Sequence, residues 1–170
     1  MTPRTPADLQ HYITAHGITA EVVFPAQETP TVPAAAAAMG CEPDQIIKSV
    51  LFLVEDGTSS GRRPVLVIAC GTARIDYKAL AAHFGVSRKK VRLAPPHVVL
   101  ETLGYPAGGV PPFGHITPVP VLMDEAVTRQ AVVYGGGGDD RSLMRLTVDE
   151  LRRVTRAAAV AVSEENGLPL

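Results

Sequence analysis

A lysine lies near the start of an otherwise apolar stretch at residues 45–54 (QIIKSVLFLV). Side chains alternate between the two faces of a strand, so Lys48 shares a face with Val50 and Phe52. An ammonium on such a face must reach water, find a partner or serve a site, because burying it unpaired is costly. Lys48 is therefore either a strand-end lysine whose head reaches water or a residue of a binding site.

The glycine- and proline-rich loop at residues 105–115 (YPAGGVPPFGH) is the second candidate. Gly108 and Gly109 let the backbone approach a ligand closely, and the prolines that follow stiffen the chain. A rigid loop with free N–H groups suits an oxyanion or a phosphate. The alternative is a tight connection whose Phe113 is buried in the core.

His115 directly follows this loop and is the histidine that we consider for a site. No His-x-x-x-His or His–Cys pattern and no Gly-x-Ser-x-Gly elbow occurs, so the spacings predict neither a metal site nor a Ser–His–Asp hydrolase. The run at residues 134–140 (YGGGGDD) lacks the ending of a phosphate loop and the spacing of a dinucleotide fingerprint. We interpret it as a turn bordering a pocket. Asp139 and Asp140 would either bind a metal or cap the next segment, and we favour capping.

These candidates must be positioned by short helices and strands. Strands outnumber helices and some neighbours are linked as hairpins, among them the pair joined by residues 55–63, so we expect a mixed sheet with packed helices. The predicted helices cover residues 5–17, 34–40, 77–85, 95–104 and 147–155, and the predicted strands cover residues 18–24, 45–54, 64–71, 89–94, 119–125, 130–138 and 157–162.

The whole chain has the composition of one compact domain over residues 1–170, with 46% hydrophobic and 19% charged residues. No apolar run approaches the roughly 20 residues that span a bilayer, and the N-terminus has no apolar signal region. We therefore expect a cytoplasmic protein with no membrane partner. Two cysteines, Cys41 and Cys70, indicate no disulfide framework.

The net charge of −1 gives no global attraction to nucleic acid. Basic residues nevertheless cluster at Arg62-Arg63, in residues 87–92 (SRKKVR) and at Arg152, Arg153 and Arg156. Each cluster is either a solvated face or a rim that contacts phosphates without reading a base sequence.

Three segments in this order and spacing resemble the YbaK/EbsC family, which is related to the editing (insertion) domain of bacterial prolyl-tRNA synthetase. They are DQIIKSVLF (44–52), RIDYKALAAHFG (74–85) and LGYPAGGVPPFGH (103–115). The similarity runs from about Thr31 to the C-terminal strand. It implies an α/β fold of the α+β type, with a curled, mixed, mostly antiparallel sheet and packed helices.

The resemblance also implies an activity. Free-standing members resemble trans-editing enzymes, which hydrolyse the ester between a wrong amino acid and a tRNA, without cofactor or metal. The implied partners are the acceptor end of a mischarged tRNA and an aminoacyl-tRNA synthetase. Because the ester is already activated, positioning a water and stabilising the oxyanion suffice.

Within this resemblance, Lys48 would hold the terminal phosphate or the ester carbonyl as a point charge. Backbone groups at Gly108 and Gly109 would orient the carbonyl or the water, and we expect a β-carbon at Gly109 to intrude on the substrate rather than on the core. The rest of the loop would contact the substrate through Val110, Pro111, Pro112, Phe113, Gly114 and His115.

The amino acid removed is not determined by these motifs. Gly135 to Gly138 stand where the alanine-specific branch of the family is expected to carry a polar His or Asn. Alanine, cysteine, serine and threonine therefore all stay open. Two rival functions also stay open: a non-catalytic tRNA- or synthetase-binding module of the same fold, and hydrolysis of a small ester or thioester unrelated to tRNA.

Overall fold

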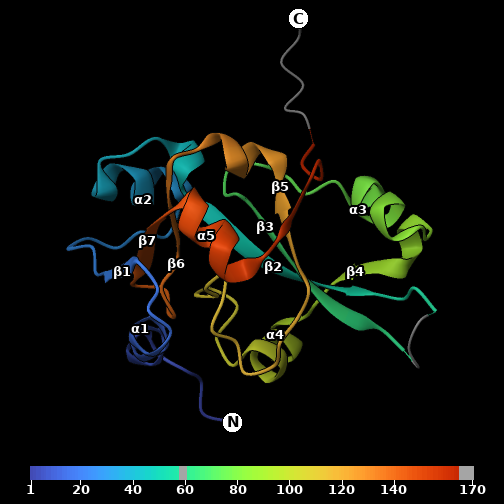
Figure 1. Cartoon of the computed structure of the whole chain (residues 1–170), viewed down its shortest axis with the longest axis horizontal. Helices are drawn as coiled ribbons and strands as arrows, with labels where there is room; N and C mark the ends of the chain where they lie inside the picture. Colours follow the sequence, from blue (N-terminus) through green and yellow to red (C-terminus); the bar gives the residue numbers. More distant parts are fainter. Residues whose placement is uncertain (58–60, 165–170) are drawn as a thin grey trace, which may run out of the picture.

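A computed structural model describes residues 1–57 and 61–164 (Figure 1). Within these residues the chain forms α-helices, β-strands and short 3₁₀ turns. In chain order the helices and strands are α1 (Pro6–Ala15), β1 (Ala20–Val23), α2 (Val32–Met39), β2 (Ile47–Val54), β3 (Arg63–Cys70), α3 (Tyr77–Phe84), β4 (Val91–Leu93), α4 (Pro96–Leu103), β5 (Val121–Asp124), β6 (Val132–Gly136), β7 (Leu143–Thr147), α5 (Val148–Thr155) and β8 (Ala158–Val160).

The larger sheet has five strands in the order β4-β2-β3-β5-β8. β2 pairs antiparallel with both β3 and β4, whereas β3–β5 and β5–β8 are parallel pairs. The connections explain this mixture: only eight residues separate β2 from β3, while α3, β4 and α4 lie between β3 and β5 and allow a crossover. The predicted hairpin is thus confirmed, although residues 58–60 of its turn lie outside the described residues.

A second sheet contains three antiparallel strands in the order β1-β7-β6. An isolated parallel bridge between Ile46 and Tyr134 connects it to the start of β2. The predicted mixed α/β class is therefore confirmed, with the strands divided into two open sheets rather than one curled sheet. Figure 1 shows the smaller sheet beside α1 and α2, and α3 with β4 at the far end of the larger sheet.

β2 is covered on both faces, which explains its almost continuous apolar sequence. Phe52 and Val54 pack in the cluster that contains Leu80 of α3. Leu51, on the opposite face, packs with Val110 of the 105–115 loop. Because side chains alternate along a strand, the side chain of Lys48 lies on the face of β2 that α3 covers. The side chains of Ile47 and Ser49 lie on the opposite face, which the 105–115 loop covers.

Helix caps confirm several sequence predictions. Asp76 is the N-cap of α3 and accepts from the amides of Lys78 and Ala79, at 2.9 and 3.1 Å. The helix ends at Gly85, whose left-handed φ of 68° suits a glycine.

No helix in the described part of the chain is both long and apolar enough to cross a membrane.

Candidate functional site

Two glycine-rich segments that are far apart in the sequence contact each other through their backbones. The amide of Gly138 donates to the carbonyl oxygen of Gly109 at 2.9 Å. A β-carbon added to Gly136 would lie 2.2 Å from the carbonyl oxygen of Val110, and one added to Gly109 would lie 2.5 Å from the Cα of Asp139. The glycines are therefore required for close approach between the loop and the β6–β7 connection.

This contact corrects one expectation. A β-carbon at Gly109 meets the backbone of Asp139, so it would disturb the fold rather than project toward a ligand. Gly108 differs, because a β-carbon there would have no atom within 4 Å. Gly108 is exposed, and among the described residues its amide has no hydrogen-bond partner, whereas the Gly109 amide donates to Pro106.

A cavity of about 170 Å³ lies where β2, the loop and the β6–β7 connection meet. Lys48, Gly108 and Val110, three of the predicted site residues, line it together. The other lining residues come from the same three segments and from the chain before α2: Thr29, Ile47, Ser49, Ala107, Gly136, Asp139, Asp140, Ser142 and Leu143.

Lys48 has a specific partner at the end of its apolar face. Its Nζ donates to the carbonyl oxygen of Ala73, in the turn that follows β3. Burial lowers the pKa of Lys48, and the nearby Cys70 has a smaller opposite effect. The same burial raises the pKa of the Cys70 thiol to about 11. An ammonium has three donors, so one bond to a carbonyl leaves Lys48 able to bind a ligand oxygen as well.

Ser49 is a residue of this cavity that the sequence did not single out. Its Oγ is buried and has no hydrogen-bond partner in the described structure. A buried hydroxyl without a partner costs free energy, which a bound polar group would recover. Its signal in the sequence was a hydroxyl inside an apolar strand, directly after the lysine.

Asp139 is also in the cavity wall. Its Oδ1 accepts from the Arg141 amide at 2.9 Å and from the Ser142 hydroxyl at 2.7 Å. The predicted capping role of Asp139 is thereby confirmed, and the predicted turn does border a pocket. In residues 1–57 and 61–164, no three His, Cys, Asp or Glu side chains are grouped as metal ligands.

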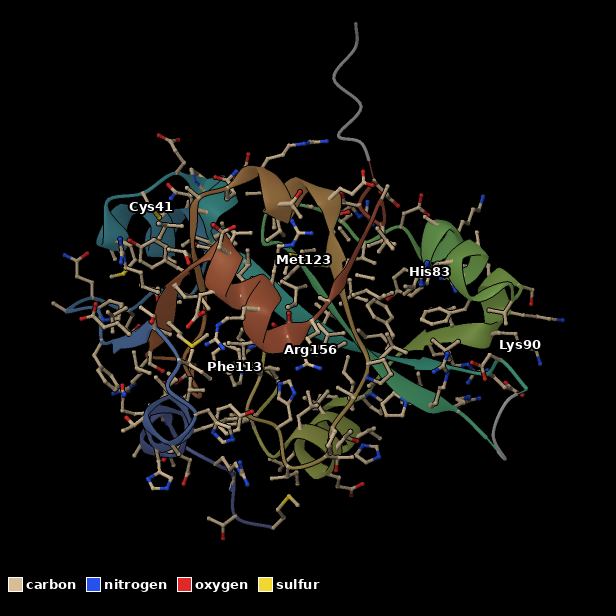
Figure 2. The ribbon with its side chains drawn as sticks, viewed as in Figure 1. Cys41, His83, Lys90, Phe113, Met123 and Arg156 are labelled. Carbon is tan, nitrogen blue, oxygen red and sulfur yellow. The ribbon has the colours of Figure 1, made fainter. Side chains whose placement is uncertain are left out.

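The second half of the loop lies behind the cavity. Pro111, Pro112, Phe113 and Gly114 are buried and are not among the residues that line it. Phe113 packs in the main core (Figure 2). Its ring centroid lies 6.0 Å from that of Tyr12. These residues support the backbone of the loop from the interior, and their contact with a substrate stays a prediction.

His115 is fixed to the same loop rather than to Lys48. Its Nε2 lies 2.7 Å from the carbonyl oxygen of Pro111. Burial lowers the pKa of His115; the bond to Pro111 opposes this, and the positive charge of Arg4 adds to it. Arg4 in turn donates to the carbonyl oxygen of Gly114 at 3.1 Å. The structure therefore places His115 as a neutral residue that holds the end of the loop.

Comparison with known proteins agrees with this arrangement. The family model of the aminoacyl-tRNA editing domain matches residues 26–154. An uncharacterized protein of Bacillus subtilis (strain 168), YwhH, is 36% identical over 121 residues, which cover 71% of this chain and 72% of that protein.

Two solved structures have closely similar folds. One is a proposed trans-editing enzyme for prolyl-tRNA synthetase, with a TM-score of 0.83, 33% identity, and coverage of 94% of this chain and 97% of that chain. The other is a hypothetical protein with a TM-score of 0.79, 29% identity, and coverage of 92% and 99%. The resemblance inferred from the three sequence motifs is thus confirmed, and the chain belongs to the aminoacyl-tRNA editing domain family.

Proposed function

We propose that this chain is an aminoacyl-tRNA deacylase that acts in trans and removes a wrongly attached amino acid from tRNA. The observation that carries the proposal is one cavity lined by Lys48, Gly108 and Ser49, in which the Gly108 amide and the Ser49 hydroxyl have no hydrogen-bond partner among the described residues. All three groups are hydrogen-bond donors, and the aminoacyl end of a tRNA is rich in hydrogen-bond acceptors. The family to which the chain belongs supports the same substrate class.

The chemistry requires positioning more than a strong nucleophile. Water adds to the ester carbonyl carbon, the carbonyl oxygen becomes negative, and the bond to the ribose oxygen then breaks with proton transfer to that oxygen. The Gly108 amide is suited to stabilising the developing negative charge. The Lys48 side chain leaves β2 on the α3 side, so its ammonium would contact the ester at the edge of the cavity. One such donor typically contributes about 10²–10³ in rate.

The dimensions and charge of the cavity favour a small amino acid. At about 170 Å³ it is smaller than the roughly 300 Å³ at which ordinary ligand pockets begin. Asp139 and Asp140 place negative charge in its wall, where the α-ammonium of an aminoacyl ester would be attracted. Alanine, cysteine, serine and threonine remain the candidate substrates.

The proposed partners are the acceptor end of a mischarged tRNA and a synthetase that delivers it, in the cytoplasm. A net charge of −1 provides little long-range attraction for RNA, which favours delivery by a second protein. We expect a synthetase to raise the rate at low tRNA concentration, where encounter limits the reaction.

Lys48→Ala tests the proposal. We expect the single-turnover rate of deacylation to fall by about tenfold or more, because the ester loses a charged donor. Arg152→Ala is the matched control, since it removes one positive charge from an exposed position on α5. Circular dichroism and the melting temperature verify that both variants are folded. An unchanged rate in folded Lys48→Ala would overturn the assignment of Lys48 to the reaction.

A further inference from the structure

A larger hollow of about 730 Å³ lies on the α3 side of the five-stranded sheet. Its floor is apolar and aromatic: Val50 and Phe52 of β2, Tyr77 of α3 and Leu93 of β4 line it. Leu93 is 55% exposed, whereas Phe52 is 1% exposed and packs in the core cluster beneath α3. Leu93 and the half-buried Val50 and Tyr77 therefore provide the accessible apolar surface of the hollow.

Four cations stand around this floor, namely Lys48, Arg74, Lys78 and Arg88. Among the described residues, Lys78 and Arg88 form no ion pair. The Arg88 guanidinium lies over the ring of Tyr77, 4.3 Å from its centroid. Arg74, Lys78 and Arg88 line the hollow from α3 and the turns on either side of it.

Two acids in the same wall compensate only part of this charge. Asp76 is occupied as the N-cap of α3, where it accepts from two amides. Glu164 approaches Arg74 at 3.9 Å, and both side chains are largely exposed, at 51% and 86%. An exposed pair of this length contributes little, so the hollow keeps an excess of positive charge in a chain whose net charge is −1.

Lys48 connects the hollow to the small cavity, because it lines both. An aminoacyl ester held in the small cavity places its terminal nucleotide beside Lys48. The hollow also adjoins Lys48, and it offers cations and an apolar floor to the nucleotides that precede the terminal one.

We infer that this hollow binds the single-stranded nucleotides that precede the terminal adenosine of an aminoacylated tRNA. Arg74, Lys78 and Arg88 contact their phosphates, and Tyr77 and Leu93 contact the faces of their bases. This combination of a cationic rim and stacking surface is the one that single-stranded nucleic acid requires. The inference rests on the proposed function, since it takes the small cavity as the site of the ester.

The test uses the full chain and two labelled RNA hairpins, one ending in a single-stranded ACCA and one ending blunt. Affinity is measured by fluorescence anisotropy at several salt concentrations. We expect the wild type to prefer the ACCA hairpin. Arg74→Ala with Lys78→Ala should weaken that binding by about tenfold at low salt and reduce the salt slope by about 1.4, since each phosphate contact contributes about 0.7.

The matched control is Arg145→Ala with Arg152→Ala, which removes two exposed charges from β7 and α5. We expect this variant to keep the affinity and slope of the wild type. Equal losses in the two double variants, no loss in either, or equal wild-type binding of the blunt hairpin would overturn the inference. Preference for an acidic peptide over the ACCA hairpin would do so as well.

The two proposals fail in different ways. If the wild type distinguishes the hairpins but hydrolyses no aminoacyl-tRNA, the deacylase proposal fails and the binding surface stands. If the wild type hydrolyses the ester while the Arg74 and Lys78 variant binds RNA as the wild type does, the binding surface alone fails.

Discussion

His115 shows how a single side chain can support a site without entering it. The ring is partly buried, and its Nε2 lies 2.7 Å from the Pro111 carbonyl oxygen. This contact is a hydrogen bond when Nε2 carries the proton, which fits a neutral ring with a lowered pKa. The imidazole therefore links the two ends of the 111–115 segment, which supports Gly109 and Val110 from the interior.

This lowered pKa gives a pH dependence of known sign. When the pKa is lower in the folded than in the unfolded state, the unfolded chain binds more protons between the two values. Neutral His115 therefore contributes its full stability when the pH is above the pKa of the unfolded state, about 6.5. This contribution is lost as the pH falls through the lower pKa of the folded state. We expect wild-type stability relative to His115→Gln to decrease over this range, as measured by urea unfolding at pH 7.5 to 5. A pH-independent difference between the two proteins would contradict the assignment.

At the same scale, sequence reasoning selected Lys48 but not Ser49, although both line the small cavity. A lysine on an apolar strand face is unusual in itself, so its chemistry stands out without a structure. A serine in a strand is ordinary. Its place in the cavity wall depends on Gly108 and Asp139, which come from segments far along the chain.

At the scale of elements, the contact between the loop and the β6–β7 connection predicts that substitution of two adjacent glycines affects stability very differently. Gly109→Ala should lower the free energy of unfolding by about 1–3 kcal/mol, because its β-carbon overlaps the backbone of Asp139. Gly108→Ala should change it by less than about 0.5 kcal/mol, because its β-carbon enters open space.

Chemical denaturation of the two glycine variants and the wild type measures this difference directly. Gly108→Ala serves as the control for the loss of backbone freedom that any Gly→Ala change produces. Equal stability of the two variants would mean that the loop and the connection are not in contact as described.

Most elements could be predicted from the sequence, with the exception of β7. Its burial alternates, with Met144 and Leu146 inside and Arg145 and Thr147 outside, but the pattern covers five residues between a glycine turn and the cap of α5. β7 is stabilised by pairing with β1 and β6 on its two sides. The pairing with β1 joins residues more than 100 positions apart and has no signal in a short segment, and the smaller sheet depends on it.

At the scale of the whole molecule, net charge was a poor guide to the distribution of charge. The formal net charge of the chain is −1, yet the hollow beside α3 is lined by four basic and two acidic side chains. The basic residues that form it come from three separated segments, of which only residues 87–92 were recognised as a cluster. Folding brings Lys48, Arg74 and Lys78 to that cluster, because β2 and α3 pack on each other.

The central claim is that the intact chain hydrolyses a mischarged tRNA. Release of the amino acid is measured from tRNAs carrying alanine, cysteine, serine or threonine, with and without EDTA. We predict that the wild type accelerates at least one release by about tenfold or more over the spontaneous rate. EDTA should leave the rate unchanged, because the described side chains group no metal-ligand set. Binding of these tRNAs without acceleration of any release would contradict the claim and identify the chain as a non-catalytic binding module.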